Sequence, residues 1–207
     1  MKEEILERAY HYALGDDECV LRSNEIRAKS PILFVVLGDK VKESIKSIKT
    51  EFSQNVMNAE GIMYLYIGLE QGIEDGQTSS LVLPLGKGEE KSSRGTLSSQ
   101  LFEEENALKI LNEQITKVRE AILEKGKMFH YWEQIQVSMI TDASEEMNSL
   151  LPDIVVLLKK KLEQDFKQVT VDLFTVLEET IYTPLEQAIS MSFFKEIETY
   201  QARDYCY

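Results

Sequence analysis

The residues best suited to chemistry lie in a polar turn from Thr141 to Asn148, with the sequence Thr-Asp-Ala-Ser-Glu-Glu-Met-Asn. An apolar, β-branched segment precedes this turn and a long apolar helical pattern follows it, which predicts a strand-turn-helix unit. The first N–H groups of a helix lack partners within the helix, and they bind phosphate where glycines allow a close approach. This turn has no glycine and contains the carboxylates Asp142, Glu145 and Glu146. We interpret it as a phosphate-binding turn whose donors are satisfied by the protein's own side chains.

The same turn contains a candidate metal-binding pattern. Asp142-Ala-Ser144 resembles the opening of the Asp-x-Ser-x-Ser motif of von Willebrand factor A domains, where hard oxygen ligands bind Mg²⁺ at the end of a strand. Glu146 stands where the second serine belongs, and Thr180 or Thr183 would have to supply a later hydroxyl. Capping of the following helix by Asp142 or Ser144 is the simpler interpretation.

Other chemistry is sparse in the sequence. His11 is predicted to lie in an N-terminal helix, and His130 lies among aromatic residues, where packing explains it better than catalysis. Cys19 and Cys206 lack the spacing of a metal knuckle or a redox pair, which indicates a reducing compartment. The triplet Gly86-Lys87-Gly88 lacks the spacing of a nucleotide-binding phosphate loop. No catalytic residue is therefore predicted.

Composition limits the classes of partner. The chain has 207 residues with 43% hydrophobic and 29% charged content, which is typical of a globular protein. Its net charge of −13 argues against nucleic acid or an anionic membrane as the main partner, and the lysines from Lys159 to Lys161 are interpreted as a solvated helix face. The sequence lacks a signal peptide and an apolar run of about 20 residues, so we expect no membrane span and a cytoplasmic location. The aromatic end at Tyr207 suggests a longer parent protein, of which this chain is the N-terminal part.

Alternating patterns of strand and helix predict the architecture. Pro31 to Gly38 is an unbroken apolar run, typical of a strand buried on both faces of a parallel sheet. A helical pattern follows from Lys40 to Val56, and a second apolar strand pattern runs from Gly61 to Gly68. This combination is a βαβ unit with a right-handed crossover.

The rest of the chain continues this alternation, which predicts a three-layer α/β sandwich: a mainly parallel, Rossmann-like sheet with helices on both faces. Pro184 is expected to open a final helix with its apolar side chains turned inward. The inward residues of that final helix are Leu185, Ile189, Phe193, Ile197 and Tyr200. The further predicted elements are helices over 2–14 and 101–125, a strand over 135–140, a helix from near Ser149 with Pro152 in its first turn, and a strand over 169–177.

The regular patterns lapse around residues 71–100. Only Leu81 to Leu85 is apolar there, and Pro84 limits it to an edge strand. Gly86 to Ser99 is rich in Gly, Ser, Lys and Glu, as loops are. We predict a single α/β domain over 1–207 with a flexible insert around 71–100.

This order of elements resembles the nucleotide-binding half of the tubulin/FtsZ superfamily, especially the bacterial tubulin-like proteins. The similar stretches are Pro31 to Gly38 with its following helix, Ile62 to Glu70, Val137 to Leu158, and Gln187 to Tyr200. The last of these is similar to a family helix of alternating small and aromatic residues that precedes a Lys-Glu-Leu-like triplet. The resemblance rests more on the order of elements than on diagnostic motifs.

The departures from that family bear on function. The glycine-rich first loop of the family is here Gly38-Asp39-Lys40-Val41, and the segment Thr141 to Met147 has none of the glycines of the Gly-Gly-Gly-Thr-Gly-Ser-Gly signature. Side chains keep a phosphate away from the backbone, and carboxylates repel it. The resemblance thus implies a degenerate nucleotide site at Gly38, Asp39, Asp142 and Ser144, with no cofactor expected.

Three hypotheses follow from the sequence. The leading one is a non-catalytic, tubulin-like α/β domain that acts through a protein partner, through self-association, or through assembly with a nucleotide-competent relative. The first alternative is a GTP-binding or hydrolysing protein with divergent loops, in which Asp39, Asp142 and Ser144 surround Mg²⁺. The second alternative is a von Willebrand factor A-like module with a metal site at Asp142 and Ser144.

Overall fold

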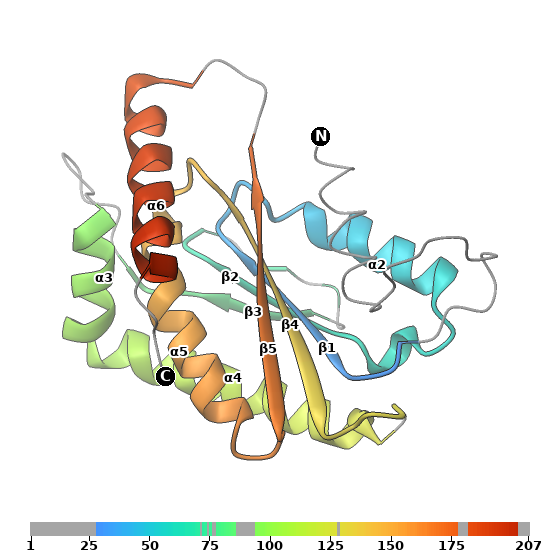
Figure 1. Ribbon diagram of the computed structural model, residues 1–207. Helices are drawn as coiled ribbons and strands as arrows, with labels where there is room; N and C mark the ends of the chain where they lie inside the picture. The colour runs from blue at the N-terminus through green and yellow to red at the C-terminus, as the bar shows by residue number, and fades with distance from the viewer. Residues whose placement is uncertain are drawn as a thin grey trace.

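The computed structural model of the protein describes residues 28–70, 72–73, 75, 78–85, 94–127, 129–177 and 182–202 (Figure 1). Several predictions fall outside these residues: the helix over 2–14, His11, Cys19, Cys206, Thr180 and the Gly86-Lys87-Gly88 triplet.

The core of the fold is a five-stranded parallel sheet in the order β3-β2-β1-β4-β5. The central strand β1 pairs with β2 on one side and with β4 on the other, as the βαβ prediction requires. The predicted α/β class with a parallel, Rossmann-like sheet is confirmed. The strands are β1 (Ile32–Leu37), β2 (Met63–Gly68), β3 (Thr78–Val82), β4 (Gln134–Asp142) and β5 (Gln168–Val176).

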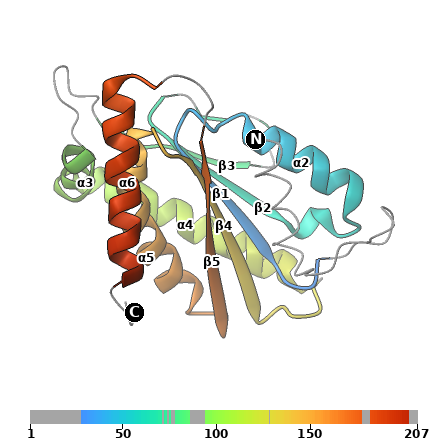
Figure 2. The ribbon, with the colours of Figure 1, turned by 45° about the horizontal axis from the view of Figure 1, so that its top comes forward.

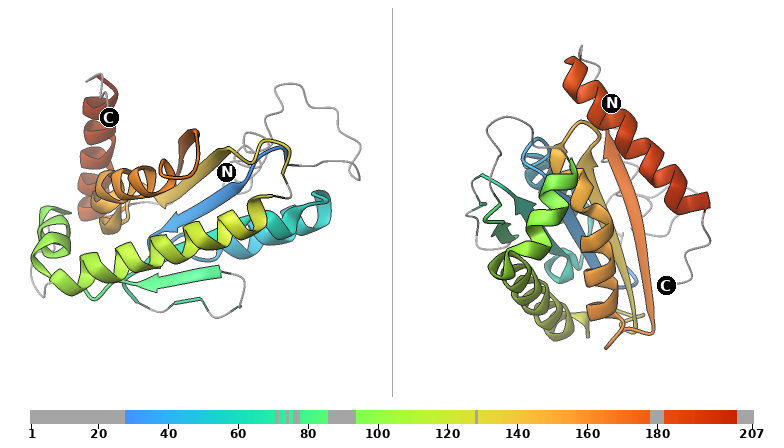
Figure 3. Two further views of the ribbon diagram at one scale, coloured as in Figure 1. Left: turned by 90° about the horizontal axis from the view of Figure 1, so that it is seen from below. Right: turned by 90° about the vertical axis from the view of Figure 1, so that its left-hand side faces the viewer.

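Helices cover both faces of the sheet, which confirms the three-layer arrangement (Figures 2 and 3). On one face α2 packs against the sheet; on the other, α4 and α5 lie across it, and α3 and α6 contribute buried side chains to the same cluster. The helices are α2 (Ser44–Asn55), α3 (Arg94–Glu103), α4 (Glu105–Gly126), α5 (Leu151–Leu162) and α6 (Pro184–Ala202), with the short 3-10 helices η1 (Ala59–Gly61) and η2 (Glu146–Leu150).

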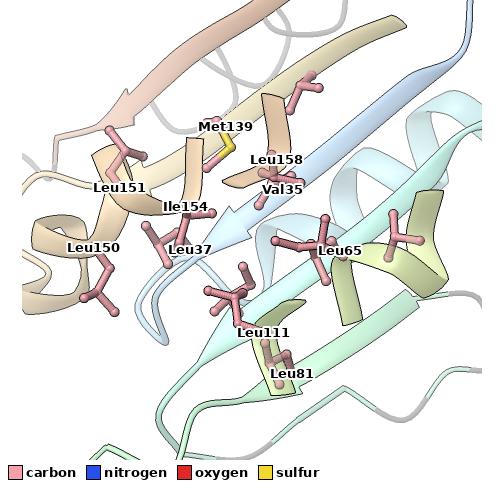
Figure 4. Close-up of a cluster of buried hydrophobic side chains, with 14 of the residues drawn as sticks. Val35, Leu37, Leu65, Leu81, Leu111, Met139, Leu150, Leu151, Ile154 and Leu158 are labelled. Atoms are coloured by element: carbon pink, nitrogen blue, oxygen red, sulfur yellow. The ribbon is translucent and has the colours of Figure 1, made fainter. Parts of the chain in front are cut away.

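The two faces of β1 explain its unbroken apolar sequence. Neighbouring residues of a strand point to opposite faces of the sheet. Val35 and Leu37 therefore join the cluster beneath α4 and α5 (Figure 4), whereas Phe34 and Val36 join the cluster beneath α2. Every residue of β1 is buried, so a polar residue anywhere in the strand would lack water on either side.

Two boundaries differ from the predictions made around the insert. The single helix predicted over 101–125 is two helices, because the backbone is extended at Glu104, and α3 begins at Arg94 within the segment expected to be a loop. Leu97 and Leu101 lie one turn apart on α3 and are buried in the core, so tertiary packing stabilises a helix that the Ser- and Gly-rich local sequence does not favour. The edge strand is Thr78–Val82 and not Leu81–Leu85, so Pro84 follows it and disrupts no pairing.

The final helix begins at Pro184 as predicted, but its apolar residues do not all face inward. Ile189 and Phe193 are buried, whereas Leu185 is 63% exposed and Tyr200 is 37% exposed. Ile197 packs half-buried against the core, and Tyr200 faces α5 and β5 without being buried. The prediction of an inward side chain is therefore wrong for Leu185. Within the described part of the chain, no helix is long and apolar enough to span a membrane.

Candidate functional site

The sequence-predicted site residues gather where β1 and β4 end. These strands are neighbours in register, so the loops that follow them begin side by side. The chain continues from β1 to α2 on one face and from β4 to α5 on the other, an arrangement that opens a crevice in doubly wound folds. Gly38 and Asp39 lie in the loop after β1, and Asp142 and Ser144 lie at the end of β4 and in the turn after it.

A carboxylate occupies the position against Gly38. The φ of Gly38 is 105°, and a Cβ at this residue would lie 2.5 Å from Cγ of Glu145. The backbone N–H of Lys40 donates a hydrogen bond of 3.0 Å to Oε2 of Glu145. This N–H belongs to the loop that contacts phosphate in nucleotide-binding folds of this layout. The side chain of Glu145 therefore fills the space beside Gly38 and occupies a backbone donor of the loop after β1.

The ammonium of Lys40 joins three segments of the chain. Its Nζ donates to Oγ of Ser144 at 2.7 Å and to Oε1 of Glu186 at 2.7 Å. Burial alone would lower the pKa of Lys40, but the hydrogen bond and charge of Glu186, with the charges of Asp142 and Glu145, raise that pKa above its ordinary value. The ammonium is thus already held by the protein's own oxygens.

Glu186 holds its position through a capping box at the start of α6. Its Oε2 accepts hydrogen bonds from the N–H and the hydroxyl of Thr183, and its own N–H donates to Oγ1 of Thr183 at 3.3 Å. The bonds from Lys40 and Thr183 lower the pKa of Glu186 to about 2. Lys40 and Glu186 were missed as site residues, although Thr183-Pro-Leu-Glu186 carries a recognisable capping signature.

Local hydrogen bonds of Asp142 shape the turn after β4. This fully buried carboxylate accepts from the N–H of Ser144 at 2.8 Å and from the hydroxyl of Ser144 at 2.6 Å through its Oδ1. The side-chain amide of Asn148 donates to the carbonyl of Ala143 at 2.8 Å. Neither Asp142 nor Ser144 caps α5, whose first residue follows η2 directly and has no side-chain cap. The capping interpretation is therefore wrong, because both side chains act within the turn.

The side chain of Asp39 binds residues at the end of β2. Its carboxylate accepts a hydrogen bond from the hydroxyl of Tyr66 and another, at 3.2 Å, from the N–H of Leu69. Tyr66 is fully buried, and burial together with the bond to Asp39 raises the pKa of its phenol. Asp39 thus fixes the end of β2 to the loop after β1.

The residues do not fit the proposed Mg²⁺ site. The ammonium of Lys40 lies at Ser144 Oγ, where a cation bound to that hydroxyl would lie, and the hydroxyl of Thr183 is bonded to Glu186. Across the part of the chain that the structure describes, no three His, Cys, Asp or Glu side chains are grouped to hold a metal. Oδ2 of Asp142 has no hydrogen-bond partner among the described residues, but the ammonium beside Ser144 and the bonded hydroxyl of Thr183 leave this oxygen without the other ligands that the motif requires.

The environment of Glu145 makes its ionisation unfavourable. Burial raises its pKa above the ordinary value of 4.5, and the charges of Asp39 and Asp142 add to this, while the bond and charge of Lys40 oppose it. The folded protein therefore keeps this proton at pH values where the unfolded chain has lost it. The contribution of Glu145 to stability falls as the pH rises from 4.5 through its raised folded value.

Replacing Glu145 by glutamine should therefore raise the thermal midpoint at pH 7. The amide oxygen can still accept the N–H of Lys40, but it carries no charge. The gain should shrink as the pH falls towards 4.5 and vanish well below it, where the wild-type carboxyl is protonated in both states. Glu113→Gln, on the exposed surface of α4, is the control for removing one negative charge from an acidic protein. A lower midpoint for Glu145→Gln at pH 7 would contradict this account.

Comparisons with models of known families, with curated proteins and with solved structures found no match to this chain. Its function must therefore be argued from its own residues and their geometry.

Proposed function

We propose that this chain is a non-catalytic α/β domain, tubulin-like in layout, that acts through contact with protein surfaces. The observation that carries the proposal is the carboxylate of Glu145, which lies against Gly38 and accepts the N–H of Lys40. A nucleotide phosphate bound in the manner of related layouts would need the same space and the same donor.

Charge adds to this steric exclusion. The charges of Asp39 and Asp142 lie close enough to Glu145 to raise the pKa of its carboxyl, and Glu145 is half-buried. Repulsion between these groups and a triphosphate would be strong in such a site, because little water screens it. The ammonium of Lys40 is already hydrogen-bonded to Ser144 and Glu186, so it could bind a phosphate only if both bonds were broken.

The proposal predicts that neither GTP nor ATP binds. Titration of either nucleotide into the 207-residue chain with Mg²⁺ should give no heat of binding, and neither should shift the thermal midpoint. A cooperative melting transition in the same sample shows that the protein tested is folded. Micromolar affinity for either nucleotide would overturn the proposal.

Two alternatives remain distinguishable by the same calorimetry. A GTP-binding protein with divergent loops requires the nucleotide titration to give heat. A metal-dependent module of the von Willebrand type requires Mg²⁺ alone to bind, and Asp142→Ala to abolish that binding. Neither alternative is supported by the geometry, because both use Ser144 as a ligand and its hydroxyl already accepts a hydrogen bond from the ammonium of Lys40.

Exposed apolar side chains support contact with other proteins. Met191 is 75% exposed and Phe194 is 42% exposed on α6, and Leu173 is 36% exposed on the edge strand β5. Single exposed apolar residues are ordinary, but these belong to neighbouring elements at one side of the sheet. This side is therefore the most suitable surface for a protein partner.

A further inference from the structure

From this surface we infer that the chain associates with a second copy of itself, in which the outward stripe of α6 on one copy enters the groove between α5, β5 and α6 on the next. The inference deepens the proposed function, on which it rests, by naming the surface and the partner. The outward stripe is defined here as Gln187, Met191, Phe194 and Glu198.

The groove is an apolar surface that the described residues leave open. It has a volume of about 520 Å³, and its apolar lining includes Pro152, Val155 and Val156 of α5 and Leu173 of β5. β5 is the last strand of the described sheet, so no further strand of the described residues covers Leu173 from beyond that edge. Its charged lining, Lys159, Lys160 and Glu163, comes from the C-terminal part of α5. The site is thus apolar along most of its length and has two lysines and one glutamate at one end, in a chain with a net charge of −13.

The outward stripe has matching chemistry. Its residues are separated by four, three and four positions, a spacing that places them on one face of a helix. All four are exposed, and the two in the middle are large and apolar. The stripe therefore presents two apolar anchors followed, one turn later, by the carboxylate of Glu198. Recognition of such a stripe in an apolar groove is a common mode of binding between a helix and a protein.

The order of apolar and charged groups is the same on both surfaces. Val156 precedes Lys160 by one helical turn on α5, and Phe194 precedes Glu198 by one turn on α6, a rise of about 6 Å in each case. When the two helices run in the same direction, Met191 and Phe194 meet the apolar part of the groove while Glu198 meets Lys160. Lys159 is already 3.8 Å from Glu163 of its own chain, so Lys160 is the better partner for an incoming carboxylate.

One copy cannot make this contact with itself. Ile197 and Tyr200 of α6 form one wall of the groove, and the outward stripe lies on a different side of the same helix, about a third of a turn away. A helix that forms the wall of a groove cannot also fill it. The stripe must therefore enter the groove of another copy. Such a contact joins two different surfaces, so each added copy leaves one stripe and one groove available, and the product is a ring or an open chain.

The test is the oligomeric state of the full chain in solution. Sedimentation velocity at concentrations up to about 200 µM should show mass that increases with concentration. Phe194→Glu, in the stripe, and Val156→Glu, in the groove, should each weaken association by at least about 30-fold. Lys160→Glu should weaken it by up to about fivefold, and adding Glu198→Lys to that variant should restore it to within about twofold.

Mixing the two apolar-site variants separates this contact from others. Phe194→Glu retains a groove and Val156→Glu retains a stripe, so the mixture should form a complex of one copy of each and nothing larger. Met57→Glu is the control, because Met57 is 72% exposed and lies after α2, away from both surfaces. Its association should equal that of the wild type. Melting curves of every variant show whether a loss of association reflects a loss of fold.

Each outcome decides the inference. A wild-type chain that stays monomeric over the whole concentration range would overturn it, as would association that Phe194→Glu leaves unchanged. A mixture of the two variants that gives only monomers would also overturn it. None of these results depends on nucleotide. A chain that fails to associate would therefore leave the calorimetric test of the proposed function unaffected, and a chain that binds nucleotide would leave the sedimentation test of self-association unaffected.

Discussion

Replacing Gly38 by alanine is expected to lower the free energy of unfolding by about 3 to 5 kcal/mol. The φ of 105° at this residue is a backbone conformation that residues with a Cβ rarely adopt, and the strain costs about 1 to 3 kcal/mol. The new Cβ would also lie 2.5 Å from Cγ and 2.9 Å from Cδ of Glu145. Relief of this clash requires Glu145 to move, and the bond from the N–H of Lys40 is then lost.

Chemical denaturation of Gly38→Ala beside the wild type measures this loss. Gly126→Ala is a matched control, since its Cβ would meet only Pro31, at an ordinary contact distance of 3.6 Å. The control should lie within about 0.5 kcal/mol of the wild type. A Gly38→Ala protein as stable as the control would show that Glu145 does not lie against Gly38 as described, and it would remove the main support for the exclusion of phosphate.

The sheet could be predicted from sequence because each of its central strands has a recognisable local sequence pattern. β1 and β2 are buried on both faces, and such strands are recognised as short, unbroken apolar runs. The turn after β4 was also interpretable, because the absence of glycine and the presence of carboxylates are properties of the turn itself. Asp142 does accept the N–H of Ser144 within the turn, whereas Glu145 accepts the N–H of Lys40 in the loop after β1, and neither η2 nor α5 has a side-chain cap.

The contacts of Lys40 could not be predicted, because they depend on sheet order. Lys40 and Glu186 are 146 positions apart in the sequence, and no local pattern relates them. They meet because β4 lies beside β1 and because α6, which follows β5, begins near the edge of the sheet where β1 and β4 end. Alternation of strands and helices indicates a parallel sheet without giving the order of its strands.

The orientation of α6 was mispredicted for a different reason. Apolar residues occur on more than one side of this helix, so periodicity does not select a single buried face. The structure selects Ile189 and Phe193 for the core and leaves Met191 and Phe194 exposed. A helix with apolar residues on two sides is what a helix between a core and a partner requires. The apolar residues on two sides of α6 thus explain both the wrong prediction of its buried face and the proposed contact.

Phe193→Ala should destabilise the protein by about 3 to 5 kcal/mol, whereas Phe194→Ala should cost about 1 kcal/mol or less. Phe193 is 1% exposed and belongs to the main core cluster, so its removal leaves a cavity beneath α6. Phe194 is the next residue and its ring centroid is 5.5 Å from that of Phe193, but it faces outward. The two variants remove the same atoms from the same helix, so composition and helix propensity are matched.

Denaturation and sedimentation of this pair should give opposite results. Phe194→Ala should keep the wild-type unfolding transition and lose association, because an exposed anchor matters only when a second copy covers it. Phe193→Ala should lose stability first and association only as α6 loosens, so added stabilising osmolyte should restore its association but not that of Phe194→Ala. If both variants lost stability equally, Phe194 would be a core residue and the outward stripe would have no role in contact. If neither did, α6 would not be anchored by Phe193, and the groove that α6 helps to form would not exist as described.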